Sequence, residues 1–287
     1  MIWKCRHYQL MITAKPLVMG ILNVTPDSFS DGGRYHKPDA AIEHGLKLAA
    51  DGADILDIGG ESTRPGAEPV PETEEIARVL PVVQGLARQL TIPISVDTMK
   101  AGVARRCLDA GAAIINDVSG LCHDPAMVPL ARESGAGLVV MHMQGMPTTM
   151  QLNPHYDDVL SEIENFFRER MATLIAEGIA SDAISLDPGI GFGKTMSHNL
   201  MLLANLDRFQ QLDRPVVLGV SRKGVIGTII GRERSERLAG SLAVGCFAVA
   251  QGAAQILRVH DVAAHRDAAL LWDALAPYRT TLSSETP

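Results

Sequence analysis

Residues 50–61 read ADGADILDIGGE, and this stretch contains the three successive parts of the unit that decides the fold. Gly52 follows a segment of helical length, at a place where a left-handed residue commonly stops a helix. The run 55–58 is short and mostly apolar, as expected of a strand covered on both faces. A glycine pair and Glu61 follow it directly. The stretch therefore predicts a helix end, a buried strand and a polar loop.

The same unit recurs along the whole chain. The predicted strands cover 17–22, 55–58, 94–96, 112–115, 138–141, 184–186, 216–220 and 256–259. The predicted helices cover 38–50, 72–89, 100–110, 125–134, 156–177, 198–211, 234–251 and 261–276. Eight alternating units favour a closed (β/α)8 TIM barrel of the α/β class over an open doubly wound sheet.

Two further features concern the organisation of the chain. Apolar side chains alternate between Trp3 and Ile12, which predicts a short N-terminal β-hairpin that could plug the N-terminal end of the barrel. No linker or low-complexity tract divides the sequence, so we expect a single domain over residues 1–287.

Composition excludes several classes of function. The net charge of −7 comes without a basic run, which argues against binding to nucleic acid or to an anionic membrane. The four cysteines are far apart and lack zinc-finger spacing, as is usual in a reducing compartment. Charges interrupt the N-terminal segment where a signal peptide needs an apolar core, and no apolar run is long enough for a membrane span. We expect a cytoplasmic protein that acts on small molecules.

Polar residues follow every predicted strand, at the end of a barrel where catalytic residues lie. A single one of them could simply cap the next helix, but capping explains the whole set poorly. The set consists of Asn23, Asp57, Glu61, Asp97, Asn116, Asp117, His142, Asp187, Ser221, Arg222, Lys223, His260 and Asp261.

Three loops refine this prediction. The segment 23–33 is long and rich in turn formers, which suggests a mobile lid, and 61–67 carries Arg64 where it could contact an anion or remain a solvated turn. The glycines of 187–194 match neither a P-loop nor a dinucleotide-binding loop. We expect them to let the backbone and Phe192 approach a flat ligand while Asp187 points into the barrel mouth.

The last two strands predict a phosphate site. Ser221, Arg222 and Lys223 follow one strand, and Arg258 and His260 alternate along the next, so these two face the same side and could hold one anion. The alternative is an internal salt bridge from Arg258 to a carboxylate inside the barrel.

Seven segments in this order carry a resemblance to a known family. They are MGILNVTPDSFSDGG, GGESTRPGA, SVDT, INDVSG, DPGIGFGK, SRK and RVHDV, and they span residues 18 to about 262. In this combination the chain resembles the dihydropteroate synthases. The resemblance implies a barrel enzyme, usually a homodimer, that joins 6-hydroxymethyl-7,8-dihydropterin diphosphate to 4-aminobenzoate during folate synthesis and releases pyrophosphate with Mg²⁺ present.

The resemblance also implies roles for individual residues. Asn23 would contact the Mg²⁺ that bridges the diphosphate, while the phosphate oxygens would be held by Thr63, Arg64, Arg258 and His260. The pterin pocket would consist of Asp97, Asn116, Met141, Asp187, Phe192, Gly219 and Lys223. The slot for 4-aminobenzoate would be formed by Thr25, Pro26, Ser28, Phe29, Pro65 and Gly224. Asn23, Asp97, Asp187, Lys223, Arg258 and His260 would carry the catalysis.

The chemistry of a pterin agrees with this assignment. Its pyrimidinone edge presents an N–H beside an amino group, and a buried carboxylate such as that of Asp187 accepts such a donor pair with both oxygens. Gly224 departs from the family, which commonly has serine there to hold the 4-aminobenzoate carboxylate. A backbone N–H at the start of the following helix could replace that hydroxyl.

Three other functions remain open at this point. A pterin-dependent methyltransferase could share Asp97, Asn116 and Asp187, but it would not need the predicted diphosphate residues. A catalytically silent pterin-binding barrel would retain the pocket without turnover. A barrel aldolase could use Lys223 as a Schiff base.

Overall fold

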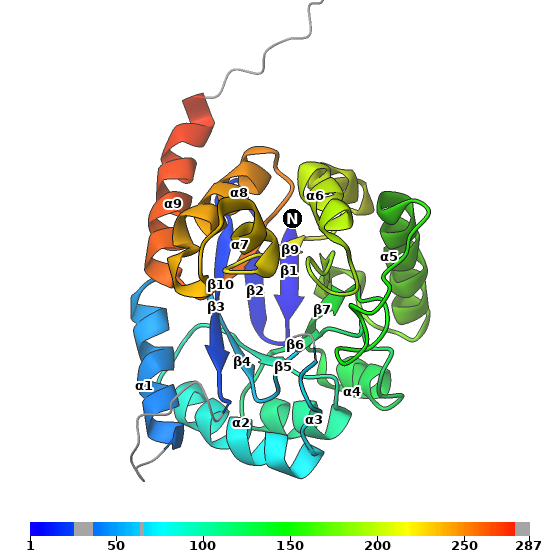
Figure 1. Ribbon diagram of the computed structural model, residues 1–287. Coiled ribbons are helices and arrows are strands. Elements are labelled where there is room, and N and C mark those ends of the chain that lie inside the picture. The colour runs from blue at the N-terminus through cyan, green and yellow to red at the C-terminus, as the bar shows by residue number, and fades with distance from the viewer. Residues whose placement is uncertain (26–36, 64–65, 279–287) are drawn as a thin grey trace, which may run out of the picture.

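The computed structural model of the protein describes residues 1–25, 37–63 and 66–278. Eight parallel strands form the centre of the molecule, and helices surround them (Figure 1). The strands are β3 (Leu17–Asn23), β4 (Ile55–Gly59), β5 (Ile94–Asp97), β6 (Ile114–Asp117), β7 (Gly137–Met141), β8 (Ile184–Asp187), β9 (Val217–Leu218) and β10 (Ile256–Val259). Their order is β8-β7-β6-β5-β4-β3-β10-β9. A parallel bridge between Leu186 and Val216 joins the two ends, so the predicted (β/α)8 barrel is confirmed.

Strand β9 is much shorter than the predicted run 216–220. The backbone turns soon after Leu218. The amide of Lys223 donates a hydrogen bond to the carbonyl of Val220 within this turn. Apolar composition could not reveal this turn, which places Gly219 and Lys223 at the mouth of the barrel.

The described part of the chain contains α1 (Lys37–Ala50), α2 (Glu72–Ala87), α3 (Ala101–Asp109), α4 (Met127–Ser134), α5 (Val159–Ala176), α6 (Met196–Ala204), α7 (Gly224–Ile230), α8 (Leu238–Ala250) and α9 (Val262–Leu275). Each predicted helix is present in part or in full. The predicted helix 198–211 ends early, at Ala204, and after Asn205 the chain continues as the 3₁₀ helix η3 (Leu206–Leu212). The predicted helix 234–251 starts with the separate 3₁₀ turn η4 (Arg234–Glu236), and α7 was not predicted.

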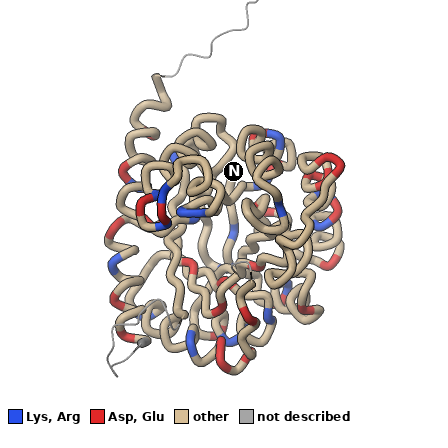
Figure 2. Tube along the Cα trace, viewed as in Figure 1, with Lys and Arg blue, Asp and Glu red and all other residues tan. Residues whose placement is uncertain are grey.

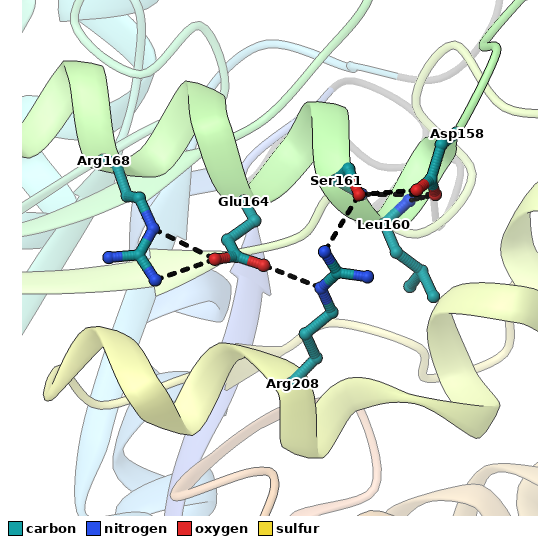
Figure 3. A network of polar contacts seen from close by, with 6 residues as sticks. All are labelled: Asp158, Leu160, Ser161, Glu164, Arg168 and Arg208. Carbon is teal, nitrogen blue, oxygen red and sulfur yellow. Dashed lines mark hydrogen bonds and ion pairs between the residues drawn. The ribbon is translucent and has the colours of Figure 1, made fainter.

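A polar network fastens η3 to α5 (Figure 3). Glu164 on α5 accepts hydrogen bonds from Arg168 at 2.7 Å and from Arg208 on η3 at 2.6 Å. Arg208 also donates to the hydroxyl of Ser161, 2.9 Å away. Figure 2 shows acidic and basic residues interspersed along the outer helices that face the viewer.

The N-terminal hairpin closes one end of the barrel, as expected. β1 (Ile2–Cys5) pairs antiparallel with β2 (Tyr8–Met11), and Trp3 and Cys5 are fully buried against the first residues of the barrel strands. The indole N–H of Trp3 donates to the carbonyl of Ala183 at 2.9 Å. At Gly137 a Cβ would lie 2.3 Å from the Cys5 sulfur, so glycine is required for this contact. Access is therefore left to the opposite end.

In the described segments, no helix combines the length and the apolar character needed to cross a membrane.

Replacing Trp3 by alanine should lower the free energy of unfolding by about 3–5 kcal/mol, because a fully buried indole and its hydrogen bond are lost. Urea unfolding measures this change. Met11→Ala is the control in the same hairpin: its side chain is exposed, so the change should stay within about 0.5 kcal/mol. Equal stability of the two variants would show that the hairpin does not brace the barrel.

Candidate active site

A cavity of about 1010 Å³ opens at the C-terminal ends of the barrel strands. The register places the polar strand ends side by side, since Gly59 pairs with Asp97, Asp97 with Asn116, and Met141 with Asp187. Residues that are paired on neighbouring strands face the same side of the sheet. The side chains at these strand ends therefore converge on one space.

Most of the predicted site residues line this single cavity. They are Asn23, Thr25, Thr63, Asp97, Asn116, Met141, Asp187, Phe192, Gly219, Lys223, Gly224, Arg258 and His260. Five others, namely Pro26, Ser28, Phe29, Arg64 and Pro65, lie outside the described residues, as does most of the predicted lid 23–33.

A buried ion cluster forms the floor of the cavity. Arg258 on β10 donates through Nε to Asp57 and through Nη2 to Asp97, both at 2.6 Å. The amide of Asn116 also donates to Asp57, at 3.0 Å. The internal salt bridge considered as the alternative for Arg258 is therefore present, and it holds the guanidinium in a fixed orientation.

The charges of this cluster are set by burial and by each other. Burial raises the pKa of Asp97, Arg258 opposes this rise, and the neighbouring Asp57 adds to it. For Arg258, burial alone would lower the pKa, but Asp57 and Asp97 hold it above its usual value, so it stays charged. One oxygen of Asp97, Oδ1, is buried without a hydrogen-bond partner among the described residues. Such an atom is costly unless a ligand or water satisfies it.

A second group of residues, Asp187, Lys223 and Phe192, forms a thin wall of the cavity beside this floor. Asp187 is 5% exposed and accepts a hydrogen bond from the amide of Gly189 at 2.7 Å, and burial raises its pKa. Lys223 donates to the carbonyl of Ile190, and its ammonium lies 4.6 Å from the centre of the Phe192 ring. Burial lowers the pKa of Lys223 to about 8.

Gly219 keeps this wall thin. A Cβ there would lie 3.5 Å from Asp187 Oδ2 and 3.9 Å from Lys223 Nζ, so it would occupy space beside both charged groups. The absence of a side chain therefore leaves room for a flat molecule that hydrogen-bonds to both.

The glycines of the 188–194 loop have a role that differs from the expected one. A Cβ on Gly189 would lie 2.0 Å from the carbonyl oxygen of His142, and one on Gly193 would lie 2.3 Å from that of Gln144. Both glycines also have positive φ, of 66° and 61°. They let the loop pack against the backbone that follows β7, rather than leaving space for a ligand.

Lys194 is a buried residue that the sequence did not single out. It is 2% exposed, and its ammonium contacts His142 Nδ1 and the carbonyl of Phe192, each at 3.0 Å. Burial lowers the pKa of Lys194 to about 7 and that of His142 to about 3. Lys194 thus fastens the loop that carries Phe192, although in sequence it resembles any lysine after a glycine-rich turn.

The residues of the predicted phosphate site differ in the groups that they contact. Arg222 donates two hydrogen bonds to the carboxylate of Asp261, one of them at 2.8 Å, and is neutralised by it. His260 lies 3.1 Å from the hydroxyl of Ser221 through Nδ1 and 3.3 Å from Arg234 through Nε2. Arg234 also lines the cavity, and the sequence did not identify it as a site residue.

The donors at the cavity suit a metal ion that is bound mainly by substrate. Among the described residues, no group of three or more His, Cys, Asp or Glu side chains could hold a metal. Asn23, whose side chain carries one amide oxygen, lines the cavity. Mg²⁺ commonly uses one or two protein oxygens together with substrate phosphates, so this donor set fits a substrate-bridged Mg²⁺.

Comparisons with known proteins agree with the fold. The family described as "Pterin binding enzyme" matches residues 19–260. Dihydropteroate synthase of Escherichia coli K12 is 49% identical over 247 residues, covering 86% of this chain and 87% of the relative. The Yersinia pestis dihydropteroate synthase, solved with a sulfonamide drug, has a TM-score of 0.90 and 43% identity, covering 96% of this chain and 100% of that one. A Xanthomonas albilineans dihydropteroate synthase with 4-aminobenzoic acid has a TM-score of 0.90 and 46% identity, covering 96% and 98%.

The lowered pKa of the buried Lys194 predicts a pH dependence of the free energy of unfolding. Its pKa is about 7 in the folded protein, whereas an unfolded chain keeps the usual lysine pKa of about 10.4. Between these values the unfolded chain binds more protons, so this residue makes the free energy of unfolding rise with pH. Lys194→Met should remove that rise, and the stability difference in favour of the wild type should grow from about pH 7 to about pH 9.

Urea unfolding at a series of pH values measures this difference. Lys47→Met, at a lysine whose side chain is 65% exposed, is the control and should show no such trend. A wild-type advantage over Lys194→Met that stays constant with pH would contradict the lowered pKa.

Proposed function

We propose, on the premise that this chain belongs to the dihydropteroate synthases of the pterin binding enzyme family, that its cavity binds both substrates of that reaction through the residues described above. The reaction joins 6-hydroxymethyl-7,8-dihydropterin diphosphate to 4-aminobenzoate, giving 7,8-dihydropteroate and pyrophosphate in folate biosynthesis. The observation that carries the proposal is the convergence of Asp97, Asn116, Asp187 and Lys223 on one cavity, beside the cationic ends of β9 and β10.

The pterin ring binds between the ion cluster and the thin wall. Asp187 accepts the N–H and amino donors of the pyrimidinone edge, and Lys223 donates to the ring acceptors. Asp97 and Asn116 complete the hydrogen bonds in the plane of the ring. Met141 and Phe192 cover its faces, and Gly219 leaves the width that it needs.

The diphosphate binds at the opposite side of the mouth. Thr63 and His260 line the cavity there and, together with Arg64 and Arg258, hold the phosphate oxygens. Asn23 would supply the protein ligand to Mg²⁺. When bound, Mg²⁺ neutralises charge that develops on the departing diphosphate.

The 4-aminobenzoate slot is assigned to residues from the segments that follow β3, β4 and β9 in the sequence. Thr25 and Gly224 line the cavity, and Pro26, Ser28, Phe29 and Pro65 belong to the adjoining loop segments. We assign to these segments the exclusion of water while the aniline nitrogen approaches the pterin methylene carbon.

The reaction needs no protein nucleophile. The bond between the methylene carbon and the diphosphate oxygen breaks, both its electrons leave with pyrophosphate, and the dihydropterin ring shares the positive charge. The carboxylates of Asp97 and Asp187 stabilise that cation, while the cationic residues near His260 stabilise the leaving group. The aniline nitrogen then forms the new bond to carbon and releases one proton.

The chain works as a homodimer of single-domain subunits in the cytoplasm. Large apolar side chains on α8 and α9 are exposed, among them Phe247 at 48%, Leu271 at 66% and Leu275 at 61%. Beside them lies an apolar cavity of about 220 Å³. An exposed apolar face of this kind is typical of a subunit interface. The cysteines are free thiols, as suits a reducing compartment.

Asp187→Asn should lower kcat/KM about 10- to 100-fold, because the amide presents a donor where the pterin also presents donors. Pyrophosphate release from mixed substrates and Mg²⁺ measures the change. Asp182→Asn is the control, since Asp182 lies in the 3₁₀ turn η2 (Ser181–Ala183) just before the same strand and pairs with Lys4 on the surface. Full activity of Asp187→Asn would exclude Asp187 from the pterin pocket.

Gly224→Ser tests the departure from the family pattern. A Cβ on Gly224 would meet no atom within 4 Å, so the serine fits without displacement. Its hydroxyl should improve 4-aminobenzoate binding by about 1 kcal/mol, seen as a lower KM for that substrate and an unchanged KM for the pterin diphosphate. A change in the pterin KM alone would place residue 224 outside the 4-aminobenzoate slot.

Light scattering tests the dimer. The wild type should have about twice the chain mass of 30.8 kDa, and Phe247→Glu should shift it to a monomer because a charge is costly inside an apolar interface. Ile175→Glu changes an equally exposed side chain on α5 and should leave the dimer intact. A monomeric wild type, or an unchanged dimer with Phe247→Glu, contradicts the interface.

A further inference from the structure

The backbone of Gly191 is held from two sides at the wall of the cavity. Its amide donates to Oδ1 of Asn199 at 2.7 Å, and its carbonyl accepts a hydrogen bond from Nε2 of Gln151, also at 2.7 Å. Gln151 belongs to the connection between β7 and α5, whereas Asn199 lies near the start of α6. Both side chains line the cavity, and the sequence singled out neither of them.

A single peptide unit links Asn199 to Lys223. The amide of Gly191 and the carbonyl of Ile190 belong to the same planar peptide, so they point in opposite directions. The amide is bonded to Asn199, and the carbonyl accepts a hydrogen bond from the ammonium of Lys223. Rotation of this peptide would break both bonds. Asn199 therefore fixes the direction in which the Ile190 carbonyl meets the ammonium.

The next peptide unit is held in the same way. The carbonyl of Gly191 accepts from Gln151, and the amide of Phe192 donates to the carbonyl of Gly189 at 3.0 Å. This unit leads to the Phe192 ring, whose centre lies 4.6 Å from the ammonium of Lys223. A cation is attracted to the face of such a ring. Gln151 therefore helps to orient the second group that the ammonium contacts.

The polar atoms of Asn199 are directed at the backbone. The residue is 5% exposed, and its Nδ2 donates to the carbonyl of Thr195 at 2.7 Å and to that of Lys194 at 3.3 Å. Its Oδ1 accepts from Gly191, so Asn199 acts on the loop and not on a ligand. The ammonium of Lys223 has three N–H donors, and the direction of the one bonded to the loop limits where the other two point.

We propose that Asn199 and Gln151 are positioning residues for the pterin: they hold the two peptide units on either side of the Gly191 Cα, and these units aim the ammonium of Lys223 at the ring acceptors. The inference rests on the proposed function, in which Lys223 donates to the pterin. A lysine side chain loses much rotational freedom when it is ordered, so ordering it before the ligand arrives lowers the cost of binding. Loss of either positioning residue weakens pterin binding although neither donates to the pterin.

Calorimetric titration of the full chain with 6-hydroxymethylpterin, which lacks a diphosphate, tests this role. Asn199→Ala should weaken pterin binding about tenfold, which corresponds to roughly 1.4 kcal/mol. Asn205→Ala is the matched control, because Asn205 follows the last residue of the same helix and its amide donates to the carbonyl of Met201 at 2.8 Å. It should change the affinity less than twofold. Equal pterin affinities of Asn199→Ala and the wild type would overturn the proposal.

Gln151→Ala provides the same test at an exposed side chain, which the fold does not need. It should weaken pterin binding about threefold to tenfold, and an unchanged affinity would overturn the hold on Gly191 from two sides. Gln210→Ala is its control, since Nε2 of this exposed glutamine on η3 donates to the carbonyl of Gln251 at 2.9 Å. If urea unfolding shows that Asn199→Ala does not fold, the comparison of Gln151→Ala with Gln210→Ala decides the proposal.

Two further measurements separate positioning from a general loosening of the site. In a Lys223→Met background, Asn199→Ala and Gln151→Ala should each change pterin affinity less than twofold, because the ammonium through which they act is gone. Effects as large as those in the wild type would overturn the proposal. Binding of Mg²⁺ and pyrophosphate should stay within twofold in both variants, and a parallel loss of pyrophosphate binding would show that the barrel end has loosened as a whole.

The wild type distinguishes this inference from the proposed function. If the wild type neither binds 6-hydroxymethylpterin nor forms product from the mixed substrates, the proposed function fails. If it does both, and Asn199→Ala and Gln151→Ala bind the pterin equally well, only the positioning role fails.

Discussion

The buried ion pairs of Arg258 with Asp57 and Asp97 organise the active end of the barrel. They connect β10 with β4 and β5 across the barrel interior, and Asn116 adds β6 through its bond to Asp57. Such a cluster contributes little to stability, because desolvation of the charges offsets much of their attraction. Its value lies in orientation: each side chain is held by the others before any ligand arrives, and that preorganisation lowers the cost of binding.

The barrel tolerates this polar interior because its two ends differ. The first inward-facing layer is apolar and is closed by Trp3, with Ile55, Ile114 and Ile256 among its members. Two residues further along the same strands, the inward positions are Asp57, Asn116 and Arg258. One end therefore supplies hydrophobic stabilisation while the other presents hydrogen-bonding groups to a ligand.

The repeating unit was enough to predict the barrel, since each strand is an apolar run with a polar end. The hairpin and most of the cavity residues were also predictable, because strand ends converge in a barrel. The short β9 and the separate α7 were not predictable, since they depend on hydrogen bonds rather than on the regular spacing of apolar residues. The burial of Lys194 and the contact of Arg234 with His260 depend on packing between distant segments, which the sequence does not reveal.

The choice among functions came from resemblance, and the relatives named dihydropteroate synthase support it over a methyltransferase, an aldolase or a silent pterin-binding barrel. The geometry adds the way in which this chain would bind its substrates. A rigid ion cluster and a thin wall define the pterin pocket, while the diphosphate side relies on oriented cations. In the proposed site Arg258 offers its remaining N–H groups to the diphosphate from the orientation in which Asp57 and Asp97 hold it, rather than as a free arm.

A crystal structure of the protein with Mg²⁺ and a non-reactive pterin diphosphate analogue tests the preformed pterin site most directly. The pterin edge should lie on Asp187, with Arg258 still bonded to both Asp57 and Asp97. A pterin bound elsewhere, or an Arg258 that leaves both carboxylates to reach the diphosphate, would contradict a preformed site.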